Sequence, residues 1–238
     1  MIHGGILGEN GVFLKERLKA SLVDVSKIKT VKSSSGHAII QVDKNGQNCI
    51  LLFAGSNHLI DDAYIDEFLK DAAKDDVLLL QNEISGLATA FDRANLKKMQ
   101  IAFNPSPYRD ELKQLPLNTV KRFFCNEIEG EALFGSSDPK KMVESFLSQY
   151  PESVLILTLG SKGSMYADKE KTFFQPAFKV QAVDTTAAGD TFTGYFLSEI
   201  AKGSTPEEAM ETATKASSVT VSRKGASDSI PYFSELND

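Results

Sequence analysis

The stretch Val183-Asp184-Thr185-Thr186-Ala187-Ala188-Gly189-Asp190-Thr191-Phe192 carries residue types that phosphate chemistry would need. Apolar residues then recur at three- and four-residue spacing, which predicts a helix beginning near Asp190. The three small residues before Asp190 would let an anion approach the unpaired N–H groups of the helix start closely. Asp190 would then stand beside the anion, placed to accept a proton from a hydroxyl. Thr and Asp are also common cap residues, so the stretch by itself predicts either an anion site or ordinary helix capping.

Polar or glycine-containing segments follow four apolar runs upstream of this stretch. They are Gln81-Asn82-Glu83, Asn104-Pro105-Ser106-Pro107, Asn126-Glu127-Ile128-Glu129 and Gly160-Ser161-Lys162-Gly163. Continuous apolar runs that alternate with helical patterns predict an α/β fold, with a mostly parallel sheet flanked by helices on both faces. Ligands bind beyond the carboxyl ends of such strands, so these segments are candidates for a binding site.

Each of these segments also has a purely structural interpretation. Glu83 could be a helix-start carboxylate favoured by the helix dipole. Asn126 could cap a helix, with Glu129 completing a capping box. Gly160 and Gly163 could make a hairpin turn.

The order of the expected elements is read from periodicity and turn residues. Helices are predicted over 12–22, 63–73, 87–99, 127–134 and 140–150, and strands over 6–8, 77–80, 101–103, 120–125 and 154–159. Two β-rich runs, 36–42 and 47–53, flank Asn45-Gly46, the strongest short signal for a β-hairpin. This hairpin could be an edge of the main sheet or a lid over a site.

Composition excludes several classes of function. The 238 residues have a net charge of −6 and a pI near 5.2, which argues against a nucleic-acid or anionic membrane surface. No apolar run approaches the length of a membrane span. Cys49 and Cys125 lack a C-x-x-C pattern and are expected to be buried thiols in a reducing cytoplasm. His3, His37 and His58 have no zinc-ligand spacing.

The segments together, in this order, resemble the ribokinase-like (PfkB-type) carbohydrate kinases. The resemblance implies a ribokinase-like fold and phosphoryl transfer from ATP to a sugar hydroxyl. It makes Asp190 the catalytic base and the N–H groups of Ala187, Ala188 and Gly189 the anion hole. Asp184 and Glu83 would contact the sugar.

The resemblance also implies a nucleotide site with Mg²⁺ and K⁺. Asn126 would lie near the triphosphate, and Glu129 would act on Mg²⁺ through water. The implied nucleotide contacts are Thr158, Gly160, Ser161, Gly163 and Thr214, and the implied K⁺ ligands are Asp184, Thr186, Arg223, Gly225 and Ser229. At Thr214 the family usually has Asn or His, so one adenine contact would be lost.

The domain expectation places an α/β core at 1–35 and 55–238 and a β lid at 36–54. Family members carry roughly sixty further residues before the point where this sequence begins, including a G-G-N motif that grips the sugar. Gly4-Gly5 is not followed by Asn, so the sugar pocket is expected to lack one wall.

Three interpretations of function remain at this point. The first is an ATP-dependent kinase. The C-terminal segment from Arg223 to Pro231, together with Asp184-Thr185-Thr186, resembles the ribokinase type and favours D-ribose as the small-molecule substrate. The second is a nucleotide-binding protein that is catalytically incomplete. The third is a kinase for fructose, a sugar phosphate or a nucleoside. A homodimer through the lid is left open, because an exposed hairpin can pair with another strand.

Overall fold

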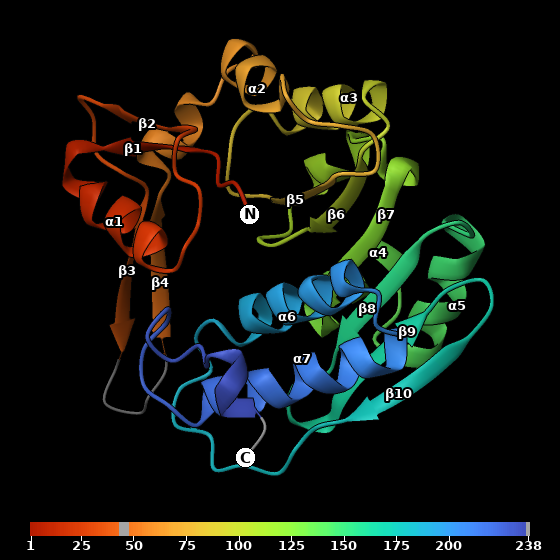
Figure 1. Ribbon diagram of the computed structural model, residues 1–238. Helices are drawn as coiled ribbons and strands as arrows, with labels where there is room; N and C mark the ends of the chain where they lie inside the picture. The colour runs from red at the N-terminus through yellow and green to blue at the C-terminus, as the bar shows by residue number, and fades with distance from the viewer. Residues whose placement is uncertain (43–47, 237–238) are drawn as a thin grey trace. The chain divides into compact units, whose positions relative to one another are not determined.

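The computed structural model describes residues 1–42 and 48–236 of the chain (Figure 1). The chain divides into two compact units. The first comprises residues 1–101 and 109–119, and the second comprises residues 102–108 and those from 120 onward. In the part of the chain that is described, no helix combines the length and apolarity that crossing a membrane would require.

The first unit begins with a small parallel pair of strands, β1 (Gly5–Gly8) and β2 (Ile28–Val31). Helix α1 (Val12–Ala20) connects them. The Tyr64 hydroxyl ties this pair to α2 (Asp62–Leu69), because it donates to the backbone oxygen of Lys27 at 2.8 Å. It also accepts a hydrogen bond from the N–H of Gly5, so one side chain holds both strands.

The expected β-hairpin is present in the first unit as a separate two-stranded sheet. Strand β3 (His37–Val42) pairs antiparallel with β4 (Asn48–Phe53), from His37 opposite Phe53 to Val42 opposite Asn48. The Asn45-Gly46 turn predicted to join them lies outside the described residues. The consecutive side chains Leu51, Leu52 and Phe53 are all more than half exposed, so both faces of β4 present apolar surface.

The remaining elements of the first unit follow the expected alternation of strand and helix. They are β5 (Val77–Gln81), α3 (Leu87–Leu96) and the first two residues of β6 (Gln100–Asn104). The six-stranded main sheet has the order β10-β9-β8-β7-β6-β5.

The second unit contains most of this sheet and the four helices that cover it. Its strands are the end of β6, β7 (Val120–Asn126), β8 (Val154–Thr158), β9 (Gly163–Ala167) and β10 (Thr172–Pro176). Strands β7 and β8 are parallel, whereas β9 pairs antiparallel with both β8 and β10. Its helices are α4 (Glu127–Phe134), α5 (Pro139–Gln149), α6 (Ala188–Lys202) and α7 (Pro206–Val221).

Adjacent residues of β7 show how the sheet is covered on both faces. The ring of Phe123 meets Phe146 of α5 edge to face at 5.5 Å, and the ring of Phe124 meets Phe196 of α6 in the same way at 5.6 Å. Successive side chains of a strand point to opposite faces, so α5 and α6 lie on opposite sides of the sheet, as Figure 1 shows. The α/β expectation with helices on both faces is therefore confirmed in this unit.

Two expectations are wrong in the first unit, namely the end of the helix predicted over 12–22 and the covering of both faces of the strand predicted over 77–80. Helix α1 ends at Ala20, Leu22 lies beyond it with φ of 60°, and none of the helical residues is buried. In β5, Leu78 and Leu80 are buried, but Val77 and Leu79 are exposed by 47% and 44%. An apolar run does not reveal whether both faces of its strand are covered, because that depends on distant elements.

Candidate active site

The predicted turn into a helix is present between Val183 and α6. The helix begins at Ala188, two residues before the predicted start, and Ala187 is its N-cap in the left-handed conformation, with φ of 61° and ψ of 9°. The Ala188 N–H donates to the Thr185 oxygen at 3.3 Å, and the Thr191 N–H donates to the Ala187 oxygen at 2.9 Å. An alanine has no polar side chain with which to cap the helix, so this start is not closed by ordinary side-chain capping.

The N–H groups of Ala187 and Gly189 have no acceptor among the residues that the structure describes. Gly189 is exposed, and a Cβ added to it would meet no described atom within 4 Å. Its backbone is not left-handed, so an open approach, not a special conformation, distinguishes this glycine. Donors of this kind at the positive end of a 15-residue helix suit a phosphate or another anion.

Asp190 follows directly in the first turn of α6 and is exposed. It borders a hollow of about 340 Å³ in the second unit. The other residues lining this hollow are Thr191, Gly194, Tyr195, Ser198, Lys202, Ile230 and Phe233. Asp190 thus borders a hollow and directly follows Gly189 in the chain, and a carboxylate at such a place could accept a proton from a bound hydroxyl.

The carboxylate of Asp184 organises the loop that leads into α6. Its Oδ1 accepts hydrogen bonds from the Thr186 N–H at 2.9 Å and from the Thr186 hydroxyl at 2.7 Å. Its Oδ2 accepts from the Gly225 N–H at 3.1 Å. The bonds from Thr186, with the bond from Gly225, lower the pKa of Asp184 below its usual value and favour the ionised form.

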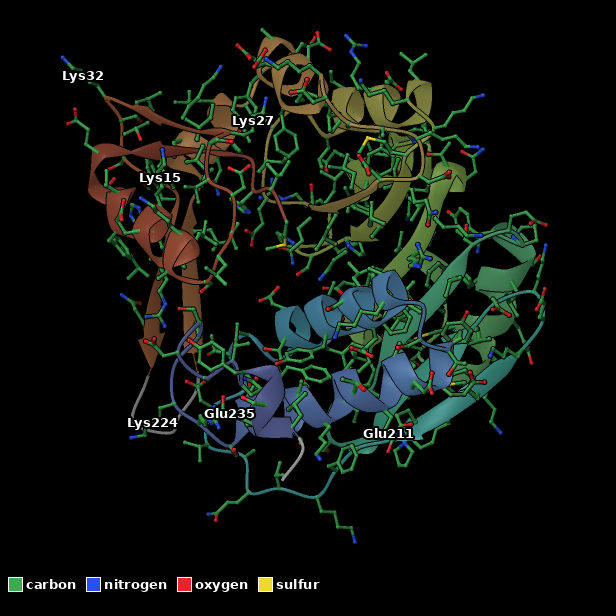
Figure 2. The ribbon with its side chains drawn as sticks, viewed as in Figure 1. Lys15, Lys27, Lys32, Glu211, Lys224 and Glu235 are labelled. Atoms are coloured by element: carbon green, nitrogen blue, oxygen red, sulfur yellow. The ribbon has the colours of Figure 1, made fainter. Side chains whose placement is uncertain are left out.

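The C-terminal tail supplies the other residues that the resemblance assigned to K⁺. Gly225 has a left-handed φ of 97°, and Ser229 is fully buried with its hydroxyl donating to the Ala226 oxygen at 2.6 Å. The Arg223 guanidinium pairs with Glu235, labelled in Figure 2, at 2.6 Å. Of the five expected ligands, hydrogen bonds join Asp184, Thr186 and Gly225 directly, whereas the Arg223 side chain is directed to Glu235.

Asn126 and Glu129 form a capping box, as the structural interpretation of these two residues predicted. Asn126 Oδ1 accepts from the N–H groups of Ile128 and Glu129. Glu129 Oε2 accepts from the Asn126 N–H at 2.8 Å, and Oε1 accepts from Asn126 Nδ2 at 3.1 Å. Asn126 itself is exposed at the end of β7, whereas Glu129 is buried. The box orders the strand end where the resemblance predicts a triphosphate contact.

The segment after β8 forms a turn, as the structural interpretation of Gly160 and Gly163 predicted. A short 3-10 turn, Gly160–Lys162, leads into β9. Gly160 has φ of 55° with open space around it, and Ser161 is exposed. Gly163 has φ of 131°, and an added Cβ would lie 2.2 Å from the Gln175 oxygen, so no other residue fits there.

Three expected contacts stand apart from these groups. The Thr158 hydroxyl donates to the Cys125 oxygen at 3.3 Å, between β8 and β7. Thr214 is buried in α7, and its hydroxyl donates to the Met210 oxygen of its own helix at 2.7 Å. Glu83 lies in the turn after β5 and belongs to the first unit, whereas the other candidate residues belong to the second.

Sequence reasoning missed the part that α7 plays in holding the turn before α6. The Val221 oxygen accepts from the N–H groups of Val183 and Asp184, at 2.7 and 3.2 Å. The Ser217 hydroxyl donates to the Ala188 oxygen at 2.9 Å, and the Thr220 hydroxyl donates to the Thr191 hydroxyl at 3.1 Å. Hydroxyl residues three apart on a helix were a weak signal, since they occur on many helix surfaces.

The described residues contain no group of three or more His, Cys, Asp or Glu side chains suited to a metal ion. The two expected ions do not require a cluster of three such side chains. Glu129 already accepts two hydrogen bonds, which fits contact with Mg²⁺ through water. The carboxylate of Asp184 accepts three and retains acceptor capacity, which fits a K⁺ ligand.

The chain matches the model of the pfkB family of carbohydrate kinases over residues 7–232. It is 33% identical to ribokinase of Schizosaccharomyces pombe, over 98% of this chain and 77% of that protein. Ribokinase of Cryptococcus neoformans var. grubii serotype A in complex with ADP superimposes with a TM-score of 0.87, at 29% identity over 99% of this chain and 81% of that one. Arabidopsis thaliana ribokinase complexed with ribose and ATP gives a TM-score of 0.85, at 27% identity over 99% and 80%.

Proposed function

Because the chain belongs to the pfkB family of carbohydrate kinases and has the expected ribokinase-like fold, we propose that it transfers the γ-phosphoryl group of ATP to a hydroxyl of D-ribose. The structural observation that carries this proposal is the start of α6. There an exposed carboxylate, Asp190, directly follows Gly189, whose N–H has no acceptor among the described residues and belongs to a helix start without a side-chain cap. The solved relatives with ADP, or with ribose and ATP, support the choice of nucleotide and sugar.

In the proposed mechanism, Asp190 accepts the proton of the sugar hydroxyl that attacks the γ-phosphorus. A positioned base of this kind contributes a factor of roughly a hundred to ten thousand. The N–H groups of Gly189 and Ala187 stabilise the charge on the transferring phosphoryl group, aided by the dipole of α6. The Ala188 N–H contributes less, because it also donates to the Thr185 oxygen.

Asp184 and Glu83 are proposed to orient the sugar by accepting hydrogen bonds from its hydroxyls. The lowered pKa of Asp184 keeps its carboxylate ionised, which makes it a strong acceptor. Asn126, Thr158, Gly160, Ser161, Gly163 and Thr214 are proposed to line the nucleotide site. The Thr214 hydroxyl is already bonded to Met210, so its contribution would be to the shape of the site.

Two metal ions belong to the proposal. Glu129 would hold Mg²⁺ through water, and Asp184, Thr186, Arg223, Gly225 and Ser229 would hold K⁺, with Arg223 contributing through its backbone because its side chain pairs with Glu235. Bound Mg²⁺ would neutralise negative charge on the phosphates of ATP.

The β3–β4 hairpin is proposed as the lid, and as the surface through which two chains pair in the cytoplasm. Its exposed Leu51, Leu52 and Phe53 would be covered in such a homodimer. Sedimentation of the wild-type protein and of Leu52→Lys tests this: a dimer is expected for the first and a monomer for the second. A wild-type monomer at all concentrations would reject the pairing.

The kinase proposal is tested by measuring ATP consumption with D-ribose, Mg²⁺ and K⁺, beside Asp190→Asn. Ribose-dependent turnover that the substitution abolishes is the expected result. D-fructose, a nucleoside and a sugar phosphate serve as competing substrates. Binding of ATP without turnover on any of these sugars would favour the alternative, a nucleotide-binding protein that is catalytically incomplete.

A further inference from the structure

The peptide group between Ala188 and Gly189 connects the interior of the second unit with the proposed anion site. Its carbonyl oxygen, on Ala188, accepts a hydrogen bond from the Ser217 hydroxyl of α7 at 2.9 Å. Its N–H, on Gly189, has no acceptor among the described residues. In a trans peptide, the C=O and N–H bonds lie in one plane and point in opposite directions. A hydrogen bond that fixes the oxygen therefore also fixes the direction of the N–H.

Such support matters in this turn, because its backbone includes a conformation that a non-glycine residue rarely adopts. Ala187 has a left-handed conformation, which costs a non-glycine residue about 1–2 kcal/mol. Gly189 adds a residue with unusual backbone freedom. Neither residue has a side chain that could make a polar contact, and the Ala188 carbonyl lies in the first turn of α6, so the Ser217 hydroxyl adds a tertiary hydrogen bond to the hydrogen bonding of the helix.

Helix α7 supplies these contacts from one face. Residues 217, 220 and 221 lie three and four positions apart, so they share a side of the helix. Thr220 and Val221 hold the flanks of the turn, at Thr191 and at Val183 with Asp184. Ser217 is the residue of this group that contacts the peptide carrying the free N–H.

We propose that Ser217 is a positioning residue for phosphoryl transfer, acting through the Ala188 carbonyl on the N–H of Gly189. Its hydrogen bond orients that N–H toward the transferring phosphoryl group. It also polarises the amide, since a hydrogen bond accepted at the carbonyl strengthens the donor of the same peptide. The kinetic part of this inference rests on the proposed kinase function, whereas the hydrogen-bonding part does not.

The expected signature is a fall in kcat with little change in the KM for ATP. An N–H that points at the transferring phosphoryl group stabilises the transition state more than it stabilises the ground state with bound ATP. For Ser217→Ala, kcat is expected to fall roughly five- to tenfold, the size of one ordinary hydrogen bond. Ser217→Thr keeps the hydroxyl and is expected to restore most of the turnover.

Ser218→Ala is the matched control. Ser218 is the next residue on α7 and is partly buried to a similar degree, but its hydroxyl donates to the Lys215 oxygen of its own helix at 2.6 Å. Loss of this hydroxyl removes one partly buried side-chain hydrogen bond of α7, as loss of Ser217 would, without touching the turn. Its kcat is expected to equal that of the wild type.

A second readout needs no turnover. The ¹⁵N resonance of an amide responds to hydrogen bonding at the carbonyl of the same peptide, so Ser217→Ala should shift the Gly189 resonance of the ligand-free protein and Ser218→Ala should not. If the wild type is active and Ser217→Ala retains its kcat, the positioning role is rejected while the kinase proposal stands. If no sugar is phosphorylated, the kinase proposal fails, and an unmoved Gly189 resonance would then overturn the inference independently.

Discussion

Asp184 and Gly225, 41 residues apart in the chain, are joined by a hydrogen bond of 3.1 Å from the Gly225 N–H to Asp184 Oδ2. The other carboxylate oxygen of Asp184 accepts twice from Thr186. One side chain thus connects the loop before α6 with the C-terminal tail, the two segments proposed to hold K⁺. This carboxylate therefore contributes negative charge to the loop and three of the hydrogen bonds that hold it.

Asp184→Asn is expected to abolish activation by K⁺ and to reduce ribose turnover strongly. An amide has one acceptor oxygen, so its NH₂ group would face the N–H of either Thr186 or Gly225. The loop would lose one hydrogen bond and the negative charge of residue 184, so Tm should fall slightly. Initial rates over a range of K⁺ concentrations, with a melting curve, measure both effects.

Asp138→Asn provides the control for this change. Asp138 caps α5, and its Oδ1 accepts from the N–H groups of Lys140 and Lys141. Asn is an equally good cap residue, so stability and K⁺ response should both remain as in the wild type. An undiminished K⁺ response in Asp184→Asn would place the ion elsewhere.

Gly189→Ala keeps the N–H donor and is expected to leave the fold intact, while turnover falls by up to about a hundredfold, the cost of one oxyanion donor that the phosphoryl group can no longer approach closely. The new methyl group would meet no described atom within 4 Å, and the backbone is not left-handed there. Replacing a helical Gly by Ala stabilises by roughly 0.5–1 kcal/mol, so Tm should be unchanged or slightly higher. The methyl group is nevertheless expected to hinder the proposed approach of the phosphoryl group to this N–H.

Gly163→Ala should behave in the opposite way, because its Cβ would lie 2.2 Å from the Gln175 oxygen and its φ is 131°. A clear loss of thermal stability is expected before any specific loss of activity. Melting curves and rates for the two variants distinguish a glycine kept for ligand access from one kept for packing. Full activity in Gly189→Ala would show that the phosphoryl group does not need the open space beside this residue.

Short-range relationships in the site could be predicted from the sequence. Asn126 and Glu129 are three residues apart, and their pattern predicted the capping box that the structure contains. The small residues before Asp190 predicted the start of α6 to within two residues. Backbone hydrogen bonding within a turn decides such features, and the local residue types determine that bonding.

Long-range relationships could not be predicted in this way. Ser217 and Ala188 are 29 residues apart, and a serine on a helix does not reveal which carbonyl it will meet. The same limit explains the exposed face of β5, where Val77 and Leu79 looked like core residues. Both outcomes depend on which elements pack together, and periodicity within one element does not carry that information.

Glu129→Gln is expected to raise the Mg²⁺ concentration required for half-maximal turnover severalfold, with only a small change in Tm. Gln is accepted at this position of a capping box, so the hydrogen bond to the Asn126 N–H can persist. The negative charge that would act on the Mg²⁺ hydration shell is lost. Rates measured against Mg²⁺ at saturating ribose provide the test.

The second capping box of the chain supplies the matched control. Glu208 accepts from the Thr205 N–H at 2.8 Å at the start of α7, as Glu129 does for Asn126. Glu208→Gln should cause a similar small change in Tm and leave the Mg²⁺ dependence unaltered. Equal Mg²⁺ dependence in the two variants would limit Glu129 to its capping role.

Tyr166→Phe is expected to make the loss of stability at alkaline pH less steep. The Tyr166 ring is buried, and its hydroxyl donates to Asp168 Oδ2 at 2.6 Å. Burial, and then the hydrogen bond to Asp168 and its charge, raise the pKa of Tyr166 well above the usual value of 10.0. The folded state therefore favours the neutral phenol. This contribution is fully present below pH 10 and is lost progressively as the pH rises through the folded-state pKa.

The free energy of unfolding, measured by denaturant titration between pH 8 and pH 11, distinguishes the two proteins. The wild type should lose stability above pH 10, and Tyr166→Phe should lose less over the same interval. Burial also raises the pKa of Cys125, so some alkaline loss should remain in the variant. Parallel curves for the two proteins would show that ionisation of Tyr166 does not contribute to alkaline unfolding, and that the hydrogen bond to Asp168 is not what links stability to pH.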